Sequence, residues 1–139
     1  MGCDVHVYGE KLEDGEWVTT DEWSEDDGYS YNTLPYSIGG RNYGFFGFLS
    51  GVRYNCKTQL DVRPLPDDLS PEVKAKREYD DCDGHSDNWV TLTELKELVA
   101  LDAIQPLADR DYFIDEVNQW IKYFNQFGDD VRIIFWFDN

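Results

Sequence analysis

The C-terminal segment places the strongest constraint on how this chain can fold. Residues 131–137 read Val-Arg-Ile-Ile-Phe-Trp-Phe, so an extended conformation would point apolar side chains to both sides of its centre. Such a pattern is typical of a strand in the interior of a sheet. We therefore expect the chain to build a sheet around this segment.

The N-terminal residues predict a partner for that strand. Residues 4–10 alternate in character, and an Asp14-Gly15 turn separates them from a second strand-like run at residues 16–19. An Asp-Gly pair between two such runs favours a β-hairpin. We expect the first and last strands to pair, which would place the two ends of the chain together.

Helices should pack against this sheet. Thr91 and Glu94 form a capping box at the start of an apolar run, and Pro71 after Ser70 is typical of a helix N-terminus. Apolar spacing and helix-ending glycines predict helices near residues 43–53, 71–79, 92–101 and 111–127. The chain is thus predicted to be an α+β protein of one compact domain over residues 1–139. Its sheet would be antiparallel or mixed and packed by about three to four helices, and residues 21–40 would form a long acidic, tyrosine-rich surface loop.

Composition limits the classes of partner. The 139 residues carry 29 acids and 12 bases, a net charge of -17, yet 41% are hydrophobic and 16% aromatic, which indicates a folded acidic protein. Such a field repels nucleic acids and anionic membranes, so we expect no direct nucleic-acid binding and no membrane association. Three cysteines without a leader-like segment favour the cytoplasm.

The two histidines give the best indication of a chemical site. On a strand, Asp4 and His6 share one face, while Cys3 lies on the other. Histidine titrates near neutral pH and is the commonest metal ligand, so His6, His85 and Asp4 are the candidate catalytic residues. If the fold gathers them with nearby aspartates, they would suit Mn²⁺, Zn²⁺ or Mg²⁺. The candidate metal ligands are Asp4, His6, His85, Asp87, Asp67 and Asp68.

A second set of residues suits an anion. Arg41 and Arg53 could hold a phosphate through paired hydrogen bonds, and Asn42 and Tyr43 lie at the start of a predicted helix, where anions bind. Ser86 follows His85 and could contact the same ligand. The alternative for all these residues is structural, because aspartates are common in turns and caps, and arginines pair with surface acids.

Several of these motifs occur together in a known group of proteins. They are Met1-Gly2-Cys3-Asp4-Val5-His6, Arg41-Asn42-Tyr43, Leu65-Pro66-Asp67-Asp68 and Asp83-Gly84-His85-Ser86 with Trp89. In this respect the chain resembles a family of small, uncharacterised phage and prophage proteins that open with Met-Gly-Cys-Asp-Ile-His. The resemblance implies a phage origin and a place in the cytoplasm of the infected bacterial host, but no established activity. Where relatives read His-Ser-His-Ser-Trp, this chain has Asp87 and Asn88 after Ser86.

Three functions follow from these observations. The first is a polar Asp/His/Arg site for a phosphate-bearing, nucleotide-like ligand, with metal-assisted phosphoester hydrolysis and a role in counter-defence. The second is a non-catalytic protein that sequesters a nucleotide signal. The third is an acidic DNA mimic that inhibits a host nucleic-acid-binding defence protein, through a patch of Asp21, Glu22, Glu25, Asp26 and Asp27.

Overall fold

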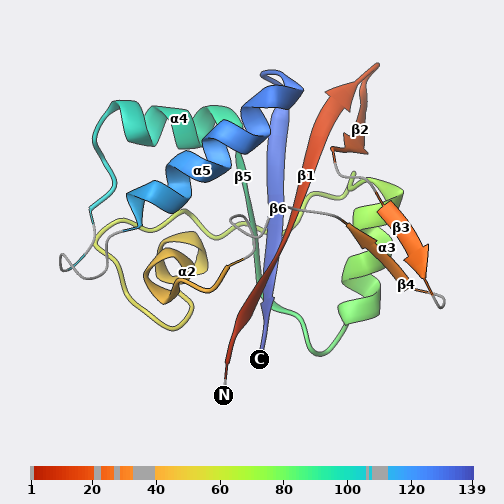
Figure 1. The fold of residues 1–139 in the computed structure, drawn as a ribbon, viewed down its shortest axis with the longest axis horizontal. Helices are drawn as coiled ribbons and strands as arrows, with labels where there is room; N and C mark the ends of the chain where they lie inside the picture. The colour runs from red at the N-terminus through yellow and green to blue at the C-terminus, as the bar shows by residue number, and fades with distance from the viewer. Residues whose placement is uncertain (1, 21–22, 27–28, 33–39, 106, 108–112) are drawn as a thin grey trace.

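A four-stranded antiparallel sheet forms the centre of the protein, shown in the computed structural model of Figure 1. The structure describes residues 2–20, 23–26, 29–32, 40–105, 107 and 113–139, with the backbone alone for 23–26 and 29–32. The strands are β1 (Asp4–Glu13), β2 (Glu16–Thr19), β5 (His85–Thr91) and β6 (Val131–Asp138), in the order β2-β1-β6-β5. The predicted pairing of the first and last strands is therefore confirmed.

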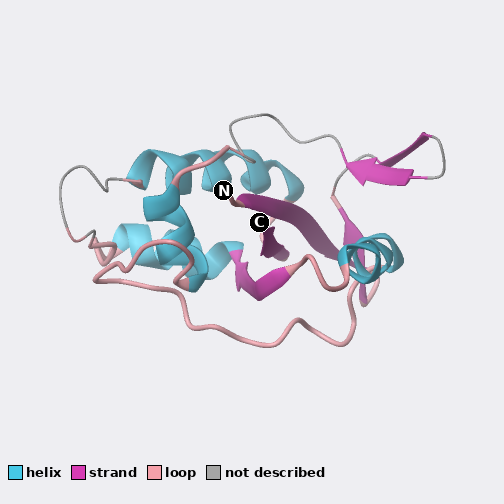
Figure 2. Cartoon of the chain, turned by 90° about the horizontal axis from the view of Figure 1, so that it is seen from below, coloured by secondary structure: helices cyan, strands magenta, loops and turns pink. Residues whose placement is uncertain are grey.

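The N-terminal hairpin forms where the sequence predicts it. Asp14 and Gly15 have φ values of 52° and 80°, the left-handed conformation that a two-residue hairpin turn requires at both positions. β1 continues beyond the hairpin and pairs with β6 from Asp4↔Asp138 to Lys11↔Val131. The two termini consequently lie side by side at one end of the sheet, as Figures 1 and 2 both show.

Three helices cover one face of the sheet (Figure 1). They are α2 (Tyr43–Ser50), α4 (Leu92–Ala100) and α5 (Ile114–Phe124), the last of which continues into the 3₁₀ turn η2 (Asn125–Phe127). Trp120 and Phe124 of α5 are fully buried with Phe135 of β6. Burial of a large apolar side chain contributes about 1.5–3 kcal/mol, so this face holds the main core.

The opposite face is covered by α3 (Pro71–Asp80) and the segment before it. Tyr8, Val73, Ile134 and Trp136 form a smaller apolar cluster there. Beside it Arg132, whose side chain is 4% exposed, donates through Nε to Glu10 Oε1 at 2.8 Å. The alternation of β6 thus supplies both cores, which explains why its sequence is apolar on both sides.

The helix signals are mostly confirmed. Thr91 caps α4 through its hydroxyl, and Glu94 returns the bond to the Thr91 backbone, so both halves of the capping box are present. Ser70 precedes α3 as expected, but its side chain makes no cap bond. Instead its backbone N–H donates to Glu10 Oε2 at 2.6 Å, which ties the start of α3 to β1.

Two parts of the chain differ from the sequence-based expectation. Within the predicted loop 21–40, β3 (Trp23–Asp26) and β4 (Tyr29–Asn32) form a two-stranded antiparallel sheet, so a continuous loop is wrong for these segments. Residues 21–22, 27–28 and 33–39 of that loop, which include Asp21, Glu22 and Asp27 of the predicted acidic patch, lie outside the described part of the chain. Residues 85–91 form β5, which the sequence analysis does not predict. Their polar composition is outweighed by hydrogen bonds to β6. In the described part of the chain, no helix is long and apolar enough to cross a membrane.

Candidate functional site

The sequence motifs meet at the end of the sheet where the termini lie. β1 begins there, β6 ends there, and β5 begins at His85, which pairs with Phe137. The loop between α3 and β5 and the N-terminus of α2 reach the same end (Figure 1). This region has two faces, one covered by α3 and the other by α2.

On the α3 face, His6 forms a close pair with Asp138. His6 Nε2 lies 2.5 Å from Asp138 Oδ2, and the two side chains are 26% and 32% exposed. The imidazole is nearly parallel to the indole of Trp136, with centroids 6.3 Å apart. A carboxylate that holds one ring nitrogen fixes the tautomer and orientation of the ring, as in the base of many hydrolases. Nδ1 of His6 makes no hydrogen bond to any described residue.

Asp4 lies next to this pair and is bound by Arg41. Arg41 Nε donates to Oδ1 at 2.6 Å and Nη2 donates to Oδ2 at 3.0 Å, the paired geometry that suits a guanidinium and a carboxylate. These hydrogen bonds lower the pKa of Asp4 and raise that of Arg41. A Cβ on Gly2 would lie 2.6 Å from Cζ of Arg41, so the absence of a side chain there leaves room for the guanidinium. Asp4 of the opening motif thus holds Arg41 against β1, beside Gly2.

On the α2 face, Tyr43 and Arg53 surround Cys3. The Cys3 side chain is fully buried, and its backbone N–H donates to the Tyr43 hydroxyl at 3.4 Å. Burial raises the pKa of the Cys3 thiol, although its hydrogen bond with Arg53 acts in the opposite direction. Arg53 Cζ lies 5.6 Å from the centre of the Tyr43 ring. These contacts hold the Arg53 side chain against the core, and the buried thiol is a poor nucleophile.

Asn42 and Gly51 lie at the two ends of α2. Asn42 caps the helix by accepting from the Phe45 N–H at 3.1 Å, and its amide donates to Glu116 Oε1 at 2.8 Å. Gly51, with φ of 70°, ends the helix in the left-handed conformation. Asn42 is therefore largely engaged in structure, whereas the turn after Gly51 opens toward solvent.

That turn lines a cavity of about 400 Å³. Its described lining residues are Gly51, Arg53, Tyr54, Asn55 and Leu107. Binding sites for small molecules commonly have volumes of about 300–1,000 Å³. The cavity is shallow and open to solvent, and Arg53 lies between it and the residues around Cys3.

His85 lies on the α2 face of β5 and contacts its neighbour Ser86. His85 Nδ1 is 2.9 Å from Ser86 Oγ, Nε2 is 3.3 Å from Asn139 Oδ1, and the ring stacks 6.5 Å from Phe137. His6 pairs with Trp136 and His85 pairs with Phe137, and neighbouring residues of β6 point to opposite faces. The two histidines therefore lie on opposite faces of the sheet, on the strands that flank β6.

The other predicted metal ligands are engaged elsewhere. Asp68 accepts from Arg132 Nη1 at 2.9 Å, and Asp87 accepts from Arg77 Nε at 2.9 Å. Asp67 is exposed in the turn before α3. The structure gathers Asp4 and His6 but does not bring the six predicted ligands together, and the described residues contain no group of three His, Cys, Asp or Glu placed to hold a metal. Binding of a divalent metal stays a prediction from the sequence.

Sequence reasoning missed Asp138 as the partner of His6. The two residues are 132 positions apart, and they meet because the terminal strands pair in antiparallel register. The predicted pairing could have suggested it, since it brings the last polar residue of β6 opposite the first residue of β1. Arg77, which binds Asp87 and the Gly84 carbonyl, was also missed because its neighbours in α3 gave no sign of a role.

Comparison with protein-family models, with curated proteins and with solved structures finds no match to this chain. The resemblance to phage proteins therefore stays a prediction.

Proposed function

We propose that this protein binds a small phosphate-bearing ligand, such as a nucleotide, in the cavity after α2, with Arg53 as the anion contact. The observation that carries the proposal is the position of Arg53. Its side chain lines the cavity and is held from behind by the Tyr43 ring and Cys3. A guanidinium that is already positioned loses less conformational entropy when it binds a phosphate.

The lining of the cavity favours an anion. Of the lining residues that the structure describes, Arg53 carries a charge, and that charge is positive. Asn55 and Tyr54 can add neutral hydrogen bonds, and Leu107 supplies an apolar wall. A phosphate with an attached base or sugar would use the ionic contact, the neutral hydrogen bonds and the apolar wall.

The α3 face is less suited to the same ligand. Asp4 and Asp138 are opposite one another in the sheet, and the Arg41 guanidinium is already paired with Asp4. Two carboxylates would repel a phosphate there. The proposal is therefore one of binding, and it coincides with the sequence-based alternative of a non-catalytic nucleotide-binding protein. Phosphoester hydrolysis through His6 or His85 is a separate prediction.

Calorimetric titration with ATP, AMP and inorganic phosphate tests this proposal. A charge-assisted hydrogen bond contributes about 1.5–3 kcal/mol, so Arg53→Gln should weaken ATP binding by roughly tenfold or more. Lys122→Gln, an exposed substitution on α5, removes the same charge and should leave the affinity unchanged. If none of the three compounds binds the wild type, the proposal is wrong.

A second variant separates binding from folding. Arg53 also contacts Tyr43 and Cys3, so its replacement could act through stability. Asn55 is an exposed residue of the cavity wall, and Asn55→Ala should weaken ATP binding while the urea unfolding midpoint stays unchanged. Unaltered ATP affinity in both Arg53→Gln and Asn55→Ala would place the ligand elsewhere.

A further inference from the structure

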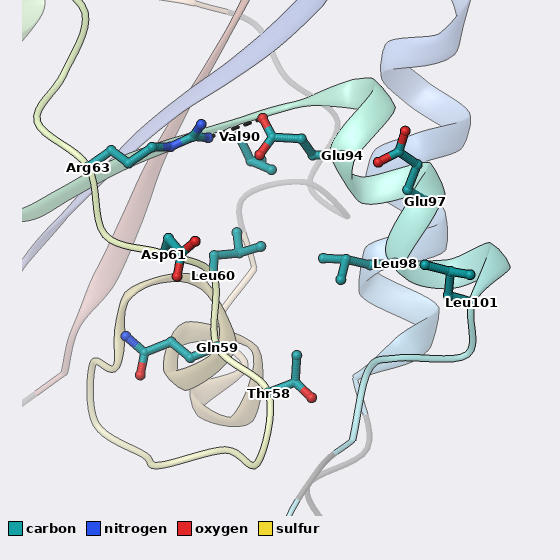
Figure 3. Close-up of a pocket in the computed structure, with 10 residues that line it drawn as sticks. All are labelled: Thr58, Gln59, Leu60, Asp61, Arg63, Val90, Glu94, Glu97, Leu98 and Leu101. Carbon is teal, nitrogen blue, oxygen red and sulfur yellow. Dashed lines mark hydrogen bonds and ion pairs between the residues drawn. The ribbon is translucent and has the colours of Figure 1, made fainter.

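A second hollow lies on the α4 side of the domain, with lining residues that differ from those of the phosphate cavity. It has a volume of about 280 Å³ and runs between residues 58–63 and α4 (Figure 3). We call it the α4 groove. It is open to solvent, since Leu101 at its end is 77% exposed.

The floor of the α4 groove is apolar. Leu60 and Val90 are 8% and 1% exposed and belong to the main core, with Leu98 packed against it. Figure 3 shows Leu60 and Leu98 pointing toward one another across the groove. The floor therefore offers a rigid apolar surface that continues to the exposed side chain of Leu101.

The rim of the groove is acidic. Glu94 is fixed by the Thr91 backbone N–H at 3.1 Å and by Arg63 Nη2 at 3.2 Å. Glu97 on α4 and Asp61 on the facing segment are both exposed, and neither forms an ion pair with any described residue. Two carboxylates thus flank an apolar floor without a cationic partner among the described residues.

We propose that the α4 groove binds an arginine or lysine side chain presented by a partner protein. The aliphatic stem of such a side chain would pack on Leu60, Leu98 and Leu101, and its charged head would lie between Asp61 and Glu97. Arginine and lysine combine an apolar stem and a cationic head in this way. The net charge of -17 adds long-range attraction for a basic partner, which raises the association rate.

Fluorescence polarisation with labelled peptides tests this inference. The probe is Leu-Arg-Leu-Lys with blocked ends, and the matched peptide Leu-Gln-Leu-Gln keeps the size and apolar residues but carries no charge. The basic peptide should bind and the neutral peptide should not. Equal affinity for the two peptides, or no binding of the basic one, would overturn the proposal.

Because any basic peptide is attracted to so acidic a protein, the variants must be matched in charge. Asp61→Asn with Glu97→Gln neutralises the rim of the groove, whereas Glu72→Gln with Glu78→Gln neutralises two exposed acids of α3 on the other side of the sheet. The groove variant should weaken peptide binding by about fivefold relative to the α3 variant. Equal losses in both variants would show general attraction and refute a site.

The apolar part of the groove is tested separately. Leu101→Ser removes an exposed apolar side chain and should weaken binding of the basic peptide, whereas Leu12→Ser, an exposed residue of β1, should not. Phosphate binding should be unchanged in the groove variants, so this inference and the proposed function can fail independently. Unchanged peptide affinity in Leu101→Ser would contradict the proposed packing of the stem.

Discussion

Replacement of Arg132 tests how α3 is attached to the sheet. Arg132 Nε donates to Glu10 Oε1 at 2.8 Å, its Nη1 donates to Asp68 Oδ1 at 2.9 Å, and its guanidinium lies 4.0 Å from the centre of the Trp17 ring. Glu10 is 0% exposed, and its second oxygen accepts from the Ser70 N–H at 2.6 Å. One buried ion pair thus joins β1, β6 and the start of α3.

The structure sets the size of the expected effect. Arg132→Leu leaves the Glu10 carboxylate buried with one backbone donor and no cation, and loss of one partner from a buried pair costs about 3–5 kcal/mol. Natural domains have unfolding free energies of roughly 5–15 kcal/mol, so this is a large share of the total. Glu10→Leu with Arg132→Leu removes both charges, so it should cost less than the sum of the two single variants by about 0.5–3 kcal/mol.

Urea unfolding followed by circular dichroism measures these free energies, with Lys11→Leu as the control. Lys11 forms an exposed pair with Glu13 at 3.9 Å, and such pairs contribute about 0.2–1 kcal/mol. If Arg132→Leu lowers the free energy of unfolding by less than about 1 kcal/mol, the reasoning is refuted. So small a loss would mean that the variant does not leave the Glu10 carboxylate buried without a partner.

Three further predictions concern stability. Thr91→Ala removes the N-cap bond of α4 and should cost about 0.5–2 kcal/mol in urea unfolding. Gly47→Ala would normally stabilise a helix, but its Cβ would collide with the backbone oxygen of Tyr54, so it should lower the free energy of unfolding by about 1–3 kcal/mol. The Arg41 hydrogen bond lowers the pKa of Asp4 below its ordinary 3.8, so the stability from this pair is present above pH 3.8 and is lost as pH falls through the lowered pKa. Urea midpoints of wild type and Arg41→Gln should therefore differ at neutral pH and converge in acid.

Local signals predicted much of the fold. The Asp14-Gly15 turn, the capping box at Thr91 and the apolar run of β6 each depend on residues close in the sequence, and all three are present in the structure. The formation of β5 depends instead on its pairing with β6, which is distant in the sequence. Ser86 has φ of 58° and the pairing with β6 shifts between His85 and Asn88, so this strand carries a bulge and polar residues that hide its period.

The residues of the candidate site stay a prediction, and the structure shows how they are grouped. Near the start of β1, Arg41 pairs with Asp4, while Arg53 and Tyr43 contact each other on the face covered by α2. His6 and His85 lie on opposite faces because their partners in β6 are adjacent residues, a relation that only the register of three strands determines. The sequence can indicate which side chains are capable of binding or catalysis, but not on which face of the sheet each one lies.

Nuclear magnetic resonance of ¹⁵N-labelled protein titrated with ATP tests the central claim most directly, because each backbone amide reports its own position. If ATP binds in the cavity after α2, the largest shift changes should fall on residues 51–55, and Arg53→Gln should abolish them at the same ATP concentration. Changes concentrated at Asp4, His6 and Asp138, or no changes at all, would contradict the account.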